Sequence, residues 1–331
     1  MRNSMFPRLT MHNKDKLLVL LLPEGSNCFL FSLTCIIIRN EEVTYMKILI
    51  EPSTKEEIYG NITDGIILSL EKYAVQSNVY FSLEEIRKIK ENNPNIEIFV
   101  NINKNLSNDD IKPLTEILKE LEQLNITGIF YYDLAVLKLK QELNLKTDLV
   151  WSQTHMVNNY KTCNYYHSKG VKYALLGKEI TLEEIIEIIK NTTIIPMVEV
   201  VGLPSVAFSK RKLITNYYKD LNKEPKSKIV VREKVSNADY ELQEDYNGTS
   251  FFLKDVVNAT GIIKDLYEVN LQYIVLREYG IESIFRELII DTKKYIESNC
   301  QNNDYVEKYK SLGDNTNFFF KKTIYQVKKN G

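Results

Sequence analysis

Short apolar runs alternate with amphipathic stretches along the chain from residue 46 onward. Apolar runs of this length, rich in β-branched and aromatic residues, are typical of buried strands, and the stretches between them have the period of helices. The runs lie at residues 48–50, 65–69, 97–101, 128–132, 148–152, 173–176, 197–201 and 273–276. Eight such units over roughly 250 residues predict an α/β fold, an eight-stranded TIM-like barrel. A doubly wound open sheet is the alternative, because the pattern does not show closure.

Three of the predicted helices have clear starts. Ser82, Ser107 and Thr181 each precede a helical pattern whose first turn is rich in acidic residues. A hydroxyl side chain before a helix accepts a hydrogen bond from its first turn, and acidic groups are favoured at that end of the helix dipole. Helices are therefore predicted to begin directly after these three residues.

The alternation is interrupted between residues 227 and 253. Three short β-like runs lie there, at 228–234, 240–243 and 249–253, and Asn247-Gly248 is a hairpin turn signal. This segment lies between the seventh and eighth predicted strands, where a barrel has its substrate-binding loops. We therefore predict an inserted antiparallel β flap at that point.

The first forty-five residues do not share this organisation. Residues 17–38 are strongly apolar, but polar residues at 24–27 divide them into runs too short to span a bilayer. A signal-peptide cleavage site is not evident. Our hypothesis is that residues 1–45 are a non-native leader or an apolar N-terminal extension; a membrane-associating tail is the alternative. We expect a barrel over 46–300, with 227–253 as its flap, and a C-terminal tail over 301–331 packing on the barrel.

Composition narrows the classes of partner. The chain has 331 residues, of which 44% are hydrophobic, so it can bury a large core. Its 43 basic and 44 acidic residues give a formal net charge of -1, so RNA would be contacted through a local basic patch. The four cysteines lack paired spacing, which indicates neither a disulfide framework nor a metal site. We expect a cytoplasmic protein without stable membrane association.

Candidate chemistry lies at the carboxyl ends of the predicted strands, because side chains there share one pocket of a barrel. His155 could lower the pKa of the Cys163 thiol, with Glu179 as a third candidate catalytic group. The alternative is that Cys163 is a buried apolar thiol. The polar residues at strand ends are Glu51, Ser69, Asn101, Asn103, Asp133, Thr154, His155, Glu179, Glu199, Arg277 and Glu278.

A second cluster follows the seventh strand. Ser209, Lys210, Arg211 and Lys212 precede a short predicted helix that carries Tyr217 and Tyr218. Cations at this spacing could hold an anion, and tyrosine rings could stack on a base. A solvated basic helix with its tyrosines packed beneath it is the alternative.

These segments together resemble the collagenase-like peptidase family U32, in particular its shorter bacterial members, from Met46 to about Lys329. Weaker matches are Lys178-Glu179 and Arg277. One specific segment holds Gly202, Pro204, Phe208, Ser209, Arg211, Leu213, Asn216 and Tyr217. The other holds Thr154, Asn159, Thr162, Cys163, Asn164, Tyr165 and Gly170.

The resemblance implies a role in hydroxylating the wobble uridine of tRNA, with prephenate as co-substrate and a longer U32 paralogue as partner. It implies contacts to RNA through Lys210, Arg232 and Lys234. It implies substrate binding by Thr154, Asn159, Lys178, Glu179, Ser209, Arg211 and Arg277.

An iron–sulfur cluster is not expected. Family members thought to carry one need cysteine thiolates near the seventh strand and in the flap, because iron in such clusters prefers sulfur ligands. This chain has Ser205, Lys212 and either Val257 or Asn258 there. Two alternatives to a supporting role in tRNA hydroxylation stay open: proteolysis, and a non-catalytic scaffold for a cysteine-bearing paralogue.

Overall fold

The computed structural model describes residues 45–315, apart from residues 154 and 236. The predicted leader and the end of the predicted C-terminal tail lie outside the described residues, and so does Thr154.

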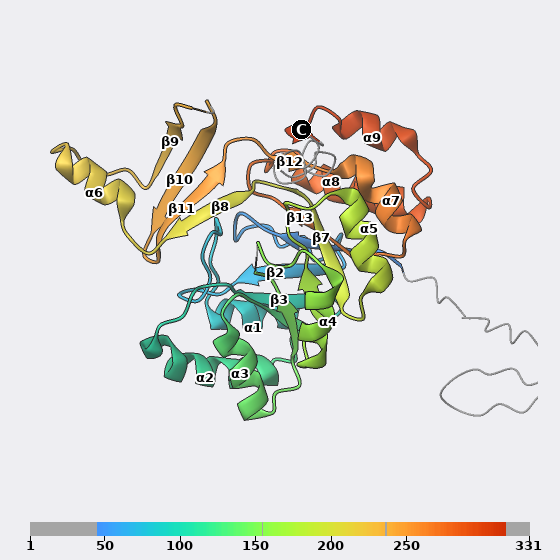
Figure 1. Ribbon diagram of the computed structural model, residues 1–331, viewed down its shortest axis with the longest axis horizontal. Helices are drawn as coiled ribbons and strands as arrows, with labels where there is room; N and C mark the ends of the chain where they lie inside the picture. Colours follow the sequence, from blue (N-terminus) through green and yellow to red (C-terminus); the bar gives the residue numbers. More distant parts are fainter. Residues whose placement is uncertain (1–44, 154, 236, 316–331) are drawn as a thin grey trace, which may run out of the picture. The chain divides into compact units, whose positions relative to one another are not determined.

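Eight parallel strands close into a barrel (Figure 1). The last of them, β13 (Tyr273–Arg277), pairs with β1 (Lys47–Glu51) on one side and with β7 (Ile195–Gly202) on the other. The predicted barrel is therefore confirmed, and the open-sheet alternative is wrong. The strands between β1 and β7 are β2 (Gly65–Ser69), β3 (Glu97–Ile102), β4 (Gly128–Tyr131), β5 (Asp148–Trp151) and β6 (Tyr173–Leu175).

Helices connect the strands, and the three predicted starts are confirmed. Ser82, Ser107 and Thr181 each begin a capping box, in which an acidic side chain three residues later returns a hydrogen bond to the cap. The helices around the barrel are α1 (Leu83–Asn92), α2 (Asn108–Gln123), α3 (Leu134–Leu143), α4 (Tyr160–Ser168), α5 (Leu182–Asn191), η1 (Thr260–Ile262), α7 (Ile263–Glu268) and α8 (Phe285–Glu297).

The barrel has separate apolar clusters inside and outside the strands. Side chains alternate between the two faces of each strand, so every second residue points into the barrel. The inner cluster is centred on Phe99, Tyr173 and Tyr273, whose rings meet edge to face at 5.7–6.3 Å between centroids. The same alternation, continued to the carboxyl ends of the strands, places Glu51, Ser69, Asn101, Ser152, Glu199 and Arg277 on the inner face.

A second sheet of four antiparallel strands is inserted between β7 and β13. Its order is β8 (Ser205–Ser209), β11 (Gly248–Leu253), β10 (Asp239–Asp245) and β9 (Lys228–Arg232). The three predicted flap strands are present, but the sheet begins at Ser205 rather than near 227. The hairpin turn is at residues 246–247, one residue before the predicted Asn247-Gly248. Helix α6 (Leu213–Asp220) packs on β10 and β11.

A short edge forms beside the carboxyl end of β7. Strand β12 (Val257–Asn258), which lies between the antiparallel sheet and β13 in the chain, pairs with β7 and with β14 (Asp314–Asn315). Helix α9 (Asn303–Tyr309) packs on α8 through Tyr305, whose ring stacks on Tyr295 at 4.5 Å. No helix of the described residues is both long enough and apolar enough to cross a membrane.

The antiparallel sheet depends on a glycine at its hairpin. Gly248 has a φ of +146°, and a Cβ there would lie 2.0 Å from the backbone oxygen of Ser209. We expect Gly248→Ala to separate β8 from β11 and lower the free energy of unfolding by about 3 kcal/mol. Amide hydrogen exchange should show lost protection in those two strands and retained protection in the barrel.

Gly170→Ala is the matched control for this substitution. Gly170 also has a positive φ, +90°, but a Cβ there meets nothing within 4 Å. Backbone strain alone should cost about 1 kcal/mol. Equal losses in the two variants would show that the close approach of Gly248 to Ser209 does not matter.

Candidate functional site

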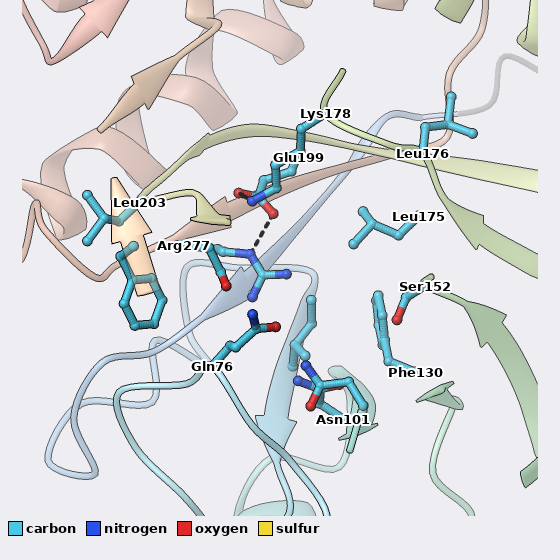
Figure 2. A pocket seen from close by; sticks show the side chains of 14 residues that line it. Gln76, Asn101, Phe130, Ser152, Leu175, Leu176, Lys178, Glu199, Leu203 and Arg277 are labelled. Atoms are coloured by element: carbon cyan, nitrogen blue, oxygen red, sulfur yellow. Dashed lines mark hydrogen bonds and ion pairs between the residues drawn. The ribbon is translucent and has the colours of Figure 1, made fainter. Parts of the chain in front are cut away.

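A polar cavity lies at the carboxyl end of the barrel. Side chains from Leu203, Ser205 and Phe252 cover it from the side of the antiparallel sheet. Figure 2 shows the Arg277 guanidinium pointing into it, with Gln76 and Asn101 on one side and Glu199 on the other. Its remaining lining residues are Ile67, Asn103, Phe130, Ser152, Leu175, Leu176 and Lys178.

Two buried carboxylates hold Arg277 in place. Its Nε lies 2.6 Å from Glu199 Oε2, and its Nη1 pairs with Glu51 Oε2. The side chains of Glu51 and Glu199 are only 7% and 5% exposed, so neither carboxylate could be left without a cation at low cost. Lys178 Nζ adds a second cation 2.6 Å from Glu199 Oε1. Two cations and two anions therefore meet at the barrel mouth.

Hydroxyl groups complete the hydrogen bonds of Glu51. Ser69 and Ser77 donate to Glu51 Oε1 at 3.2 and 3.1 Å, and Asn101 Nδ2 donates to the Ser69 hydroxyl at 3.2 Å. Such bonds offset the loss of water around a buried charge. The network joins β1, β2, β3 and the loop after β2 into one rigid floor under Arg277.

Backbone features fix the loops around Arg277. The neighbouring carboxylate, Glu278, is buried and accepts hydrogen bonds from the Tyr59 hydroxyl and, at 2.6 Å, from the backbone N–H of Ser53. On β7, a Cβ at Gly202 would lie 2.9 Å from Glu199 Oε1 and 3.0 Å from Arg277 Cβ. Glycine at position 202 therefore leaves room for the side chains of Glu199 and Arg277 to pack against the backbone of β7.

Burial changes the titration of the central ion pairs. It raises the pKa of Glu199, against the opposing effect of Lys178, and it lowers the pKa of Arg277 to about 10. Arg277 therefore stays protonated at neutral pH. Amide and hydroxyl groups surround the two cations, and Phe130 and Leu175 form an apolar wall. This arrangement can bind a small carboxylate that has an apolar body.

The sequence-predicted binding residues separate into groups. Lys178 and Arg277 line the cavity. The side chains of His155 and Glu179 pair at 3.3 Å outside the cavity lining and are 60% and 57% exposed. Asn159 is the N-cap of α4 and accepts a hydrogen bond from the backbone N–H of Thr162.

Ser209 and Arg211 lie on the antiparallel sheet rather than in the cavity. The Ser209 hydroxyl accepts a hydrogen bond at 3.2 Å from the Arg211 backbone N–H, and the Arg211 backbone oxygen accepts one from Thr249. The Arg211 side chain is exposed, as is that of Lys210. In the segment from Gly202 to Tyr217 that resembles the family, Ser209 and Arg211 therefore lie outside the described cavity that Arg277 lines.

Cys163 has the surroundings of a core residue. Its side chain is fully buried on α4, and burial raises the pKa of the thiol to about 11. The described contact of the His155 ring is with Glu179, and none to Cys163 is present in that part of the chain. A thiol with this pKa is protonated at neutral pH, which argues against the predicted nucleophile.

The residues that would hold an iron–sulfur cluster do not fit one. Ser205, Lys212 and Val257 offer a hydroxyl, an ammonium group and methyl groups, and the Lys212 ammonium donates to the Asp245 backbone oxygen. The two cysteines in the described ranges are both buried; Cys163 lies on α4 and Cys300 in the turn after α8. Residues 45–315, leaving aside 154 and 236, contain no cluster of three or more metal-ligating side chains.

Several cavity residues are absent from the binding residues that were predicted from the sequence. Phe130, Ser152 and Leu175 are at inward positions of strand ends, so strand alternation could have identified them. Gln76 comes from the long loop after β2 and has a positive φ of 62°. Neither its residue type nor its spacing carries a signal that places it beside Arg277.

Removing the charge of Arg277 should lower the stability of the fold, because two buried carboxylates pair with it. We expect Arg277→Gln to lower the free energy of unfolding by about 3–5 kcal/mol near pH 8, because Glu51 is left without a cation and Glu199 keeps only Lys178. Their pKa values in the folded variant then rise above those in the unfolded chain. A group with a raised folded pKa stabilises the fold at low pH and loses that contribution as pH rises, so the deficit should shrink towards pH 5.

Urea denaturation across this pH range checks the expectation. Arg286→Gln is the matched control, because Arg286 pairs with Glu57 at the surface and both side chains are at least 42% exposed. It should cost less than about 1 kcal/mol and show little change with pH. A deficit for Arg277→Gln that is small, or constant with pH, would contradict the buried network.

A model of Peptidase family U32 matches residues 53–227. The chain is 26% identical over 305 residues to tRNA hydroxylation protein P2 of Bacillus subtilis (strain 168), covering 84% of this chain and 99% of that protein. It is 24% identical over 162 residues to tRNA hydroxylation protein P1 of the same organism, covering 48% of this chain and 38% of that protein. A solved structure, the U32 peptidase Mk0906, is 12% identical, with a TM-score of 0.45 over 72% of this chain and 94% of its own.

Proposed function

This chain belongs to peptidase family U32, and we propose that it is a cytoplasmic subunit that supports hydroxylation of the wobble uridine of tRNA. The observation that carries the proposal is the pair of cations, Lys178 and Arg277, in the covered mouth of the barrel. The similarity to tRNA hydroxylation protein P2, which extends over 99% of that relative, supports the same function.

The cavity suits a small carboxylate as co-substrate, and prephenate is our choice within that class. Prephenate has a non-aromatic ring that carries one carboxylate directly and a second carboxylate on its pyruvyl side chain. Lys178 and Arg277 would hold carboxylate oxygens, since charge-assisted hydrogen bonds of this kind are the strongest polar contacts available. Phe130 and Leu175 would pack against the ring, and Asn101 and Gln76 would satisfy the remaining polar atoms.

The tRNA would lie on the basic surface next to the antiparallel sheet. Exposed cations follow β8 and continue through α6 and the segment after it: Lys210, Arg211, Lys219, Lys223 and Lys226. The ring of Tyr217, 57% exposed, offers a stacking face among them. This local patch would supply the attraction to phosphate that a chain of net charge -1 lacks overall.

Proteolysis is not favoured by the geometry. A peptidase needs an activated nucleophile, an activated water or a metal ion. The buried carboxylates Glu51 and Glu199 are each held in ion pairs with Arg277. The Cys163 thiol is buried, and its pKa is raised. We propose instead that a longer U32 paralogue works beside this chain on the RNA.

Nucleoside mass spectrometry of tRNA tests the function. Deleting the gene should remove the nucleosides derived from hydroxyuridine, and the wild-type gene should restore them. Lys178→Gln should restore few of them, because one of two cavity cations is lost. Lys138→Gln, the same change at an exposed position on α3, should restore them fully. An unchanged nucleoside profile in the deletion strain would overturn the proposal.

Salt-dependent binding tests the RNA surface. The double variant Lys210→Gln/Arg211→Gln should bind tRNA more weakly and reduce the slope of log affinity against log salt by about 2, since each phosphate contact contributes about 1. The control Lys138→Gln/Arg286→Gln removes the same two charges from α3 and α8. Equal slopes for the two double variants would exclude the patch as the RNA contact.

A further inference from the structure

Strand β9 leaves an open edge on the antiparallel sheet. It is the last strand in the order β8-β11-β10-β9, so β10 lies on one side of it and no described strand lies on the other. Figure 1 shows it at the side of the sheet away from β8. An edge of this kind presents unpaired backbone groups to any extended chain that comes near.

The register identifies which backbone groups face outward. Glu233 N–H donates to the Ala238 oxygen at 2.9 Å, and Glu244 N–H donates to the Ser227 oxygen at 2.8 Å. Hydrogen-bonded pairs alternate along an antiparallel ladder, so Ile229 and Val231 also bond inward to β10. The N–H and C=O groups of the three residues between them therefore point to the open edge: Lys228, Val230 and Arg232.

The protection of this edge against strand addition is limited to the two charged side chains at its ends. Proline, a bulge or a charged side chain, lysine above all, normally guards an exposed edge. The sequence of β9 has no proline, and its register with β10 is continuous. Lys228 is paired with Glu241 at 2.8 Å, and Arg232 with Asp239 at 2.7 Å. Between these two pairs lies Val230, 55% exposed.

We propose that β9 is a docking edge to which a strand of the longer U32 paralogue adds. The strand would place an apolar side chain opposite Val230 and acidic side chains opposite Lys228 and Arg232. Backbone hydrogen bonds would supply much of the affinity and the side-chain pairs the specificity, as in other cases of strand addition. The identity of the partner rests on the proposed function, and the open edge does not.

Charge and polarity exclude the other occupants. Two copies paired antiparallel around Val230 would place Lys228 of one opposite Arg232 of the other, and like charges at opposed positions are destabilising. RNA phosphates would gain little from the exposed valines at the centre of this edge, whereas an added strand can use the outward N–H and C=O groups of Lys228, Val230 and Arg232. The predicted RNA contact through Arg232 is therefore less suited to this strand than to the patch around α6.

A proline substitution tests the edge without breaking the ladder. The N–H of Val230 faces outward, so Val230→Pro should leave the pairing with β10 intact while blocking strand addition. Purified chain and purified paralogue are mixed, and the dissociation constant is measured by titration calorimetry. Val230→Pro should weaken the complex at least tenfold, and Val230→Thr, which keeps the N–H and a β-branched side chain, should change it less than twofold.

A second variant guards against a folding defect in the first. Val230→Asp keeps the N–H but places a negative charge opposite the expected acidic strand, so it should also weaken the complex. Circular dichroism and thermal melting should match wild type for both variants. Unchanged affinity in either variant with native melting would overturn the proposal.

Three further outcomes would also overturn it. If the wild-type protein and the paralogue formed no complex, β9 would not be a docking edge for the paralogue. The nucleoside profile of the deletion strain would still test the proposed function separately. A wild-type homodimer that Val230→Pro dissociates would assign the edge to a second copy. Loss of tRNA affinity in Val230→Pro, with paralogue binding unchanged, would assign it to RNA.

Discussion

The ion pairs of Arg277 with Glu51 and Glu199 are the constraint on which the site depends. Three strands of the barrel, β1, β7 and β13, meet at this point, and each contributes one charged side chain. Charges buried at this depth are tolerated only when each is paired and hydrogen-bonded, so the strands must keep their register to within one residue. The same strand register is therefore required both to close the barrel and to bring the charged groups together at its mouth.

The antiparallel sheet depends on the same barrel end. Two tyrosines on barrel loops fasten it: the Tyr80 hydroxyl donates to Asp245 at 2.6 Å, and Tyr279 contacts Glu241 on β10. The sheet in turn places Phe252 over Arg277, so the cavity is covered. Among the described strands, the outer strand of this sheet, β9, pairs with β10 alone.

The sequence predicted the barrel well because strand alternation and helix capping are local signals. The inward positions Glu51, Asn101, Glu199 and Arg277 were collected from strand ends alone, and the structure brings them together. Of the binding residues that the family resemblance implies, Lys178 and Arg277 line this cavity, and Ser209 and Arg211 lie outside it. Ser209 and Arg211 belong to β8 and the turn after it. The sequence did not predict this position, because β8 pairs with β11 across about 40 residues and such a contact carries no local signal. Gln76 was missed for a similar reason, since a long loop brings it to the cavity.

The central claim is that the barrel mouth binds a small carboxylate through its two cations. Titration calorimetry of prephenate into the purified chain tests it most directly. The account predicts saturable binding by the wild type that Lys178→Gln weakens at least tenfold and that Lys138→Gln leaves unchanged. Binding that is absent from the wild type, or equal in the two variants, would contradict it.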